Sequence, residues 1–258
     1  MKEYMKTTVI GMMVSALCVC GAMAQTNQAP AGPGVKAMQQ AAEARQYLFA
    51  FVYEKDDEGT RSARKAFEAA VGKAVPTARS VAVDRSAPAE KEMVEKLGLQ
   101  DAPMPMVLAI APNGAVTGGI KAAEVSEARL QDAVASPCSQ RCFKALQDGE
   151  LVVLCVQNAK TRGNEAAMKG VKEIKADGWY SETTEVIQVD PTDPKEAKLM
   201  AQLKVEPKTK KAITAVLAPP GMLVAKIEGA TTKDSLKAAF KKAAEGCAPG
   251  SGCCPTVK

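Results

Sequence analysis

The sequence predicts an α/β protein of two tandem domains, each with a mixed central sheet flanked by helices. Three observations lead to this prediction. Short unbroken apolar runs alternate with stretches of helical periodicity, which is typical of strands that a sheet buries between layers of helices. The same order of elements occurs twice along the chain. Near the end of each half, a tight turn rich in proline and glycine separates two strands and indicates an antiparallel hairpin.

In the first half, a leading helix is followed by elements in the order β-α-β-α-β-β-α. A polar turn separates the first apolar strand from a long helical pattern, and the Pro-Asn-Gly turn at 112–114 joins the last two strands. We expect helices at 35–45, 61–74, 89–97 and 124–135, and strands at 47–53, 80–84, 106–111 and 115–118.

The second half repeats this order, with a Pro-Pro-Gly turn at 219–221. The interval from Asp84 to Leu97 recurs as the interval from Asp190 to Leu203, which indicates that the halves are duplicates. We expect helices at 138–147, 164–176, 195–203 and 233–244, and strands at 151–156, 186–190, 212–218 and 222–227. The predicted domains span 35–135 and 136–246.

One segment of the first half adds a resemblance to a known family. The sequence Leu97-Gly98-Leu99, followed by Pro103 to Gly114, is similar to the thioredoxin segment that carries a cis-proline before a hairpin. The order of elements resembles the thioredoxin fold in both halves. The resemblance implies a cis peptide bond at Pro105. The matching stretch of the second half, 210–214, contains no proline, so no cis bond is expected there.

Redox-active thioredoxins place a Cys-x-x-Cys motif where the first long helix begins, because a helix N-terminus stabilises the attacking thiolate. The corresponding turns here, at 54–61 and 157–164, contain no cysteine. The resemblance therefore implies a tandem thioredoxin-like protein that lacks the usual redox motif, and it favours a function other than catalysis.

The first 24 residues predict a cleavable signal peptide. Lys2 and Lys6 precede the uncharged apolar run Val9 to Cys20, and Ala22-Met23-Ala24 has the small-x-small pattern that signal peptidase accepts. The run is shorter than the roughly 20 residues that a membrane-spanning helix needs. We therefore expect an exported protein, periplasmic or secreted, with no stable membrane anchor after cleavage.

Two further segments flank the predicted domains. A polar segment rich in proline and glycine, 25–34, is expected to be flexible, and a tail rich in cysteine, glycine and proline, 247–258, ends the chain.

Composition excludes several classes of function. The 258 residues include no histidine, so Ser-His-Asp and Cys-His nucleophile pairs and histidine-ligated zinc or copper sites are impossible. The formal net charge is +5, and basic residues are scattered among acidic ones. No basic patch predicts a nucleic-acid partner.

The cysteines outside the signal peptide carry the remaining chemistry. Ser136 and Pro137 predict the start of a helix, which places Cys138 and Cys142 one turn apart on a partly buried face. Cys155 lies inside an apolar strand and is expected in the core. The candidate site consists of five residues: Cys138, Cys142, Cys247, Cys253 and Cys254. They form structural disulfides or supply thiolates to a soft ion such as Cu(I) or Zn(II).

The interpretation we favour is an exported, thioredoxin-like binding or scaffold protein whose displaced cysteines bind a soft metal ion or form disulfides. Its partner is then another exported protein. The alternative is a thiol-disulfide oxidoreductase or thiol carrier that acts through Cys253 and Cys254 or through Cys138 and Cys142.

Overall fold

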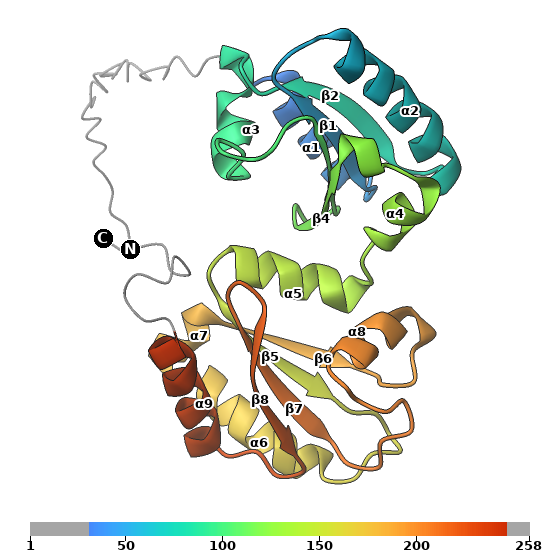
Figure 1. The fold of residues 1–258 in the computed structure, drawn as a ribbon. Coiled ribbons are helices and arrows are strands. Elements are labelled where there is room, and N and C mark those ends of the chain that lie inside the picture. Colours follow the sequence, from blue (N-terminus) through green and yellow to red (C-terminus); the bar gives the residue numbers. More distant parts are fainter. Residues whose placement is uncertain (1–30, 247–258) are drawn as a thin grey trace, which may run out of the picture.

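The computed structural model describes residues 31–246, which fold into two units with a four-stranded sheet each (Figure 1). The predicted signal peptide, most of the segment expected at 25–34 and the tail at 247–258 lie outside the described residues. Within residues 31–246, no helix has the length and apolar character needed to cross a membrane.

Domain 1 consists of the elements from α1 to α4. Its strand order is β2-β1-β3-β4, in which β1 and β2 are parallel and the other neighbours are antiparallel. In chain order the elements are α1 (Pro33–Glu43), β1 (Leu48–Tyr53), α2 (Glu58–Ala74), β2 (Arg79–Asp84), η1 (Pro88–Glu90), α3 (Lys91–Lys96), β3 (Met106–Ile110), β4 (Val116–Lys121), η2 (Ala122–Glu124) and α4 (Glu127–Asp132).

Domain 2 consists of the elements from α5 to α9 and has the same strand order, β6-β5-β7-β8, with the same directions. In chain order the elements are α5 (Pro137–Gln147), β5 (Leu151–Val156), α6 (Asn164–Lys175), α7 (Gly178–Thr183), β6 (Thr184–Val189), η3 (Pro194–Glu196), α8 (Ala197–Gln202), β7 (Ile213–Ala218), β8 (Met222–Glu228) and α9 (Lys233–Gly246).

Each sheet separates two apolar layers, because successive side chains of a strand point to opposite faces. In domain 1, α1 and α3 pack on one face, and α2 and α4 pack on the other. In domain 2, α5 and α8 cover the first face, while α6 and α9 cover the second. Both domains therefore have the predicted thioredoxin-like architecture, a mixed sheet flanked by helices.

Three local features differ from the sequence-based expectation. The parallel strands were expected to be buried on both faces, but β2 is an edge strand and is largely exposed at Arg79, Ser80 and Ala82. The short helix α7 was not expected at all. Helix α1 begins at Pro33, so Pro33 and Gly34 are not part of a flexible segment. Proline is favoured in the first helical turn, and a buried carboxylate binds the Gly34 N–H.

Helix α5 of domain 2 lies against strand β4 of domain 1 (Figure 1). The Gln147 side chain accepts a hydrogen bond from the Val116 N–H at 3.0 Å and donates one to the Val116 carbonyl at 2.7 Å. The Tyr47 hydroxyl donates to the Ala135 carbonyl at 3.2 Å and accepts from the Ala135 N–H at 2.8 Å. The Gln147 contacts hold the edge strand β4 of domain 1 against α5, and the Tyr47 contacts fix the segment that leads into α5.

Candidate functional site

The two described cysteines of the candidate site lie on α5. Ser136 caps the helix by accepting a hydrogen bond from the Ser139 N–H, and Pro137 occupies the first turn. Cys138 is partly buried, and Cys142, one turn later, is only 4% exposed. Both pack against the apolar layer between α5, α8 and the sheet. The sequence predicted this shared, partly buried face correctly.

A buried carboxylate supports the start of α5. Glu196, which is 2% exposed, accepts a hydrogen bond from the Cys138 N–H at 3.1 Å and another from the Ser136 hydroxyl. The Cys138 thiol is 3.7 Å from the Gln188 carbonyl, within the range of a weak S–H hydrogen bond. The negative charge of the Glu196 carboxylate opposes thiolate formation at Cys138.

The pKa values of the thiols follow from this environment. Burial and the Glu196 carboxylate raise the pKa of Cys138 to about 11. Burial, followed by the neighbouring Cys138 and then Glu196, raises the pKa of Cys142 to about 12. A reactive cysteine has a lowered pKa. The raised pKa values of both thiols disfavour the thiolate form at neutral pH.

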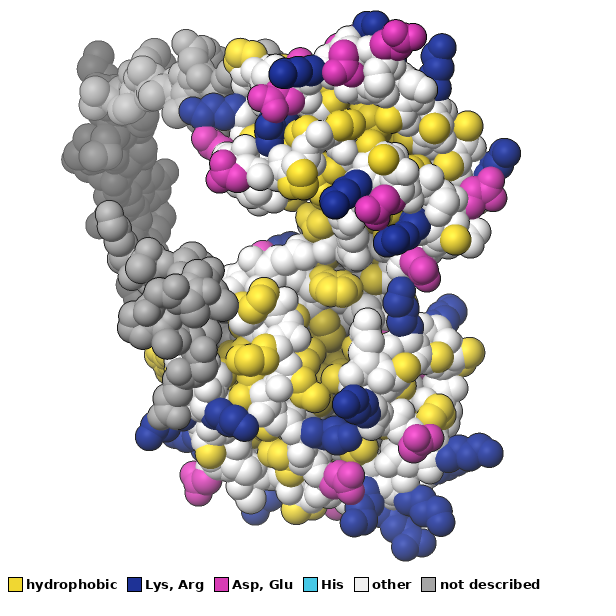
Figure 2. Space-filling view, in the orientation of Figure 1, with side chains coloured by type: hydrophobic (Ala, Val, Ile, Leu, Met, Phe, Trp, Pro, Cys, Tyr) yellow, Lys and Arg dark blue, Asp and Glu magenta, His cyan; other side chains and the backbone are white. Residues whose placement is uncertain are grey.

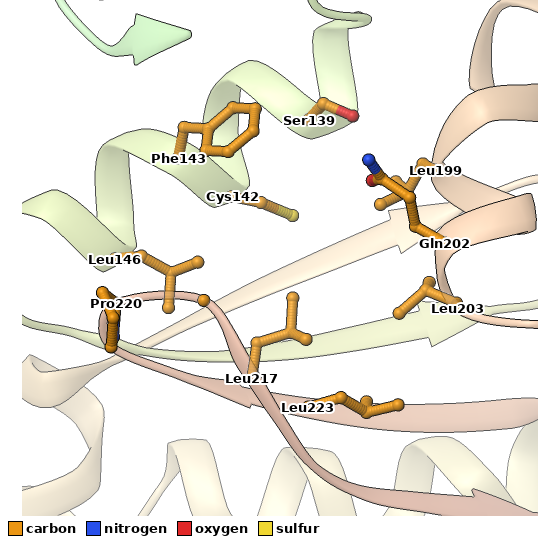
Figure 3. Close-up of a pocket in the computed structure, with 11 residues that line it drawn as sticks. Ser139, Cys142, Phe143, Leu146, Leu199, Gln202, Leu203, Leu217, Pro220 and Leu223 are labelled. Atoms are coloured by element: carbon orange, nitrogen blue, oxygen red, sulfur yellow. The ribbon is translucent and has the colours of Figure 1, made fainter. Parts of the chain in front are cut away.

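The Cys142 side chain points into a pocket between α5, α8 and the β7–β8 hairpin (Figure 3). The pocket has a volume of about 330 Å³. Its walls are mostly apolar, with the polar side chains of Ser139 and Gln202 at one end (Figure 3). The lining residues include Cys142, Phe143, Leu146, Leu199, Leu203, Leu217 and Leu223.

Among the described residues, the one further cysteine, Cys155, lies apart from this pair. Cys155 is 2% exposed and belongs to the apolar layer on the opposite face of the sheet, as expected of a core residue. Cys247, Cys253 and Cys254 lie outside the described residues. Among residues 31–246, no group of three or more cysteine or acidic side chains is placed to hold a metal ion. The five-sulfur site therefore stays a prediction.

A second candidate site is the groove beside Pro105 in domain 1. The Met104–Pro105 peptide bond is cis, the geometry that the resemblance implies. Pro105 and Met104 face the first turn of α2 across a cavity of about 430 Å³. The other lining residues are Asp57, Gly59, Thr60, Ala63, Pro103, Lys121, Ala122 and Ala123.

Asp57 stands at the start of α2, the position at which redox-active thioredoxins carry a cysteine. Its carboxylate accepts a hydrogen bond from the Thr60 N–H at 2.8 Å. That bond is the largest cause of the lowered pKa of Asp57. An ionised carboxylate at a helix N-terminus is electrostatically favourable, but it provides no sulfur for disulfide exchange. The turn that faces this groove, 54–61, therefore contains no cysteine.

The corresponding region of domain 2 is built differently. Polar side chains fill the start of α6, where the Thr161 hydroxyl donates to the Asn164 side chain at 2.7 Å and the Asn164 amide donates to the Asn158 carbonyl at 2.8 Å. Among the described residues, the only cis bond besides Met104–Pro105 joins Pro219 and Pro220, in the β7–β8 turn. Domain 2 therefore lacks the cis-proline groove of domain 1.

The sequence reasoning missed the two buried glutamates and the pocket beside Cys142. Glu90 and Glu196 lie in short 3₁₀ turns that begin with proline, in Pro-Ala-Glu and Pro-Lys-Glu. The recurrence of Pro-x-Glu in the two halves was the available signal. The pocket had none, because its walls come from α5, α8 and the β7–β8 hairpin, which are distant from one another in sequence.

No protein-family model matches the chain, and no curated protein sequence matches it. Solved structures of tandem thioredoxin domains are similar in fold. The N-terminal domain of alkylhydroperoxide reductase AhpF from Enterococcus faecalis is 14% identical, with 81% of this chain and 99% of that chain covered and a TM-score of 0.25. The first two thioredoxin domains of Eps1p from Saccharomyces cerevisiae are 7% identical, with 84% and 97% covered and a TM-score of 0.29. The bb fragment of ERp72 is 12% identical, with 82% and 94% covered and a TM-score of 0.27. At these identities and TM-scores the comparisons carry no argument about what this chain does.

Proposed function

We propose that this chain is an exported thioredoxin-like binding or scaffold protein, and that the groove beside cis-Pro105 receives an extended segment of another exported protein. The observation that carries the proposal is an open groove of about 430 Å³ opposite a helix start that holds Asp57 instead of a thiol. Such a groove offers a surface for binding, but it contains no nucleophile that could attack a disulfide.

The backbone beside the groove suits an extended ligand. The Met104 N–H and carbonyl have no hydrogen-bond partner within residues 31–246, whereas the Pro105 carbonyl accepts from the Ala122 N–H at 3.0 Å. An extended peptide satisfies such unpaired backbone groups by pairing with them as a strand would. Met104 supplies an adaptable apolar wall, and Lys121 supplies a positive charge at the rim.

A blocked-groove variant tests this proposal. Extended peptides selected from a random 12-residue displayed library are titrated calorimetrically against the native chain, Ala63→Trp and Ala69→Trp. Ala63 lines the groove, while Ala69 is an exposed residue farther along the same helix. We expect Ala63→Trp to weaken binding at least tenfold and Ala69→Trp to leave it unchanged. Equal affinity for all three proteins would place the peptide site elsewhere and refute the proposal.

The cysteines are the second part of the proposal. We infer that Cys138 and Cys142, together with Cys247, Cys253 and Cys254, bind a thiophilic ion such as Cu(I) or Zn(II) or form structural disulfides. Support comes from the i, i+4 spacing on α5 and from the partial exposure of Cys138. The raised pKa values oppose the role of nucleophile but not that of a sulfur that a metal deprotonates on binding.

Mass spectrometry of the intact exported protein separates these states. Measured natively and after alkylation without reductant, the mass gives the cleavage site, the retained metal and the number of free thiols. We expect cleavage after Ala24 and either a bound ion that alkylation displaces or a thiol count lowered by disulfides. A purified chain that still begins at Met1 contradicts the proposed export. A chain in which every thiol is free and which binds no added Zn(II) or Cu(I) contradicts the proposed role of the cysteines.

A further inference from the structure

The pocket beside Cys142 continues into a polar crevice between the two domains. Ser139, Phe143 and Gln202 line both the apolar pocket of about 330 Å³ and an adjoining cavity of about 260 Å³. The second cavity also receives Thr117 from β4 of domain 1. The two cavities adjoin at these three residues, with mostly apolar walls at the domain 2 end and mostly polar walls at the domain junction.

The apolar end is open to solvent. Leu199, Leu203 and Leu217 form its buried floor, whereas Phe143 and Leu223 at the rim are 37% and 43% exposed. Figure 2 shows hydrophobic side chains exposed on this face of domain 2, around a hollow. In Figure 3 the Cys142 sulfur and the leucine side chains point toward the same space.

The polar end carries positive charge. Lys195 and Lys198 line it together with Asp132. The Lys198 ammonium donates to the Asp132 carbonyl at 2.9 Å and lies 3.7 Å from its carboxylate. No residue in the described range 31–246 pairs with the Lys195 ammonium. One lysine charge is thus offset by Asp132, and the second is available to an anion.

We propose that the two adjoining cavities bind an unbranched carboxylate, with the alkyl chain on the leucines and the carboxylate at Lys195. At about 30 Å³ for each water-sized group, the apolar pocket holds roughly ten methylene groups. Burial of apolar chain surface provides the affinity, and charge complementarity at Lys195 fixes the orientation. Ser139 and Gln202, which stand between the two ends, offer hydrogen bonds near the head group.

The repeat indicates that this space is a feature of domain 2 and not a requirement of the fold. With α1 placed on α5, Met38 of domain 1 corresponds to Cys142, and Met93 corresponds to Leu199. Both methionines pack in the apolar layer of domain 1, where such long, flexible side chains fill irregular gaps. Domain 2 has a shorter side chain at each position.

Calorimetric titration of the reduced native chain with decanoate and with decanol tests the proposal. We expect decanoate to bind with a Kd on the order of 100 µM and decanol to bind about tenfold more weakly, because it lacks the charge-assisted contact. Cys142→Met, which introduces the residue of domain 1, should weaken both ligands at least tenfold. Lys195→Gln should weaken decanoate alone, and Lys208→Gln, an exposed lysine elsewhere in domain 2, should change neither.

Leu223→Gln keeps the test decisive if Cys142→Met does not fold, because Leu223 lies at the exposed rim. It should weaken both ligands severalfold without a change in thermal stability. The proposal is overturned if decanoate does not bind, if decanol binds as tightly, or if binding is indifferent to the pocket variants. Ala63→Trp, which blocks the other groove, should leave decanoate binding unchanged, so the two sites can fail independently.

Discussion

The helices that open the two domains, α1 and α5, are held in the same way. Each begins with a proline in its first turn, and each has a buried glutamate from the facing 3₁₀ turn at its N-terminus. Glu90 accepts from the Gly34 N–H at 3.0 Å, and Glu196 accepts from the Cys138 N–H at 3.1 Å. This shared contact satisfies helix donors that lack a partner inside the helix.

The side chains around these caps differ. Gly34 leaves no room for a side chain, because a Cβ there would lie 2.3 Å from the Met93 sulfur and 2.6 Å from a Glu90 oxygen. In domain 2, Cys138 occupies this position beside the shorter Leu199. Both domains therefore have the contact between a buried glutamate and a helix N–H, but they differ in the side chains that pack around it. In domain 1 the side chains of Met38 and Met93 fill the space beneath the first helix. In domain 2 the corresponding region contains Cys138, Cys142 and a pocket.

Removal of either glutamate should have the largest effect on stability. Glu90→Ala and Glu196→Ala each leave buried donors without an acceptor, and we expect each to cost about 3 kcal/mol. The single tryptophan, Trp179, stacks edge-on with Tyr180 and reports on domain 2. In thermal unfolding, Glu196→Ala should lower the midpoint of the Trp179 fluorescence transition. Glu90→Ala should leave that midpoint unchanged and lower only the midpoint of a transition seen by circular dichroism, which reports on both domains. If both variants had the melting temperature of the native chain, the two glutamates would not stabilise their domains.

Alkaline pH should destabilise domain 2, which contains the buried thiols, more than domain 1. Burial raises the pKa of Cys138 to about 11 and the pKa values of Cys142 and Cys155 to about 12, from 9.0. Above pH 9 the unfolded chain loses these protons while the folded chain keeps them, so stability falls as pH rises. Between pH 8 and 10 we expect a loss of about 1 kcal/mol for each of Cys142 and Cys155, and less for the partly exposed Cys138, whose charge is screened by solvent.

Domain 1 provides the internal control for this pH dependence. It has no cysteine in residues 31–135, and its buried Tyr47 has a pKa raised above 10.0, so its loss of stability should begin about one pH unit later. Urea unfolding followed by Trp179 fluorescence and by circular dichroism at each pH gives the comparison. Equal losses in the two domains below pH 10 would refute the assignment to the thiols.

Exchange of the filling residues should have an intermediate effect. Gly34→Cys forces a side chain against Met93 and Glu90 and should destabilise domain 1 by about 2 kcal/mol. The double variant Gly34→Cys/Met93→Leu reproduces the pair found in domain 2 and should recover most of that loss. The free energy of unfolding from urea titration checks both variants. Additive losses in the double variant would mean that the two positions do not compensate one another.

The contact between the domains should contribute least. Gln147→Ala removes two hydrogen bonds to Val116 and should cost about 1 kcal/mol. Glu43, the residue of α1 that corresponds to Gln147, is exposed, and Glu43→Ala should be neutral. Differential scanning calorimetry measures both effects. An unchanged melting profile for Gln147→Ala would mean that this side chain does not stabilise the contact between the domains.

Much of this architecture was predictable because periodicity, turns and duplication are local signals. The hairpins, the buried Cys155 and the shared face of Cys138 and Cys142 follow from residue spacing alone. Two kinds of feature did not follow. The exposure of β2 depends on its place at the sheet edge, which strand pairing decides. The position of Glu196 under α5 joins residues 58 apart in sequence, and no local pattern records such a contact.

The central proposal is that this chain, which has no thiol beside the cis-proline groove, does not act as a thiol-disulfide oxidoreductase, and disulfide turnover tests it most directly. Asp57 is the N-cap of α2 and Thr60 lies three residues later, so Asp57→Cys/Thr60→Cys introduces a Cys-x-x-Cys motif opposite Pro105. With a glutathionylated peptide as substrate and dithiothreitol as reductant, the native chain should show no turnover above the uncatalysed rate, and the variant should show turnover. Turnover by the native chain that Cys138→Ser/Cys142→Ser or Cys253→Ser/Cys254→Ser abolishes would contradict the claim and identify an oxidoreductase.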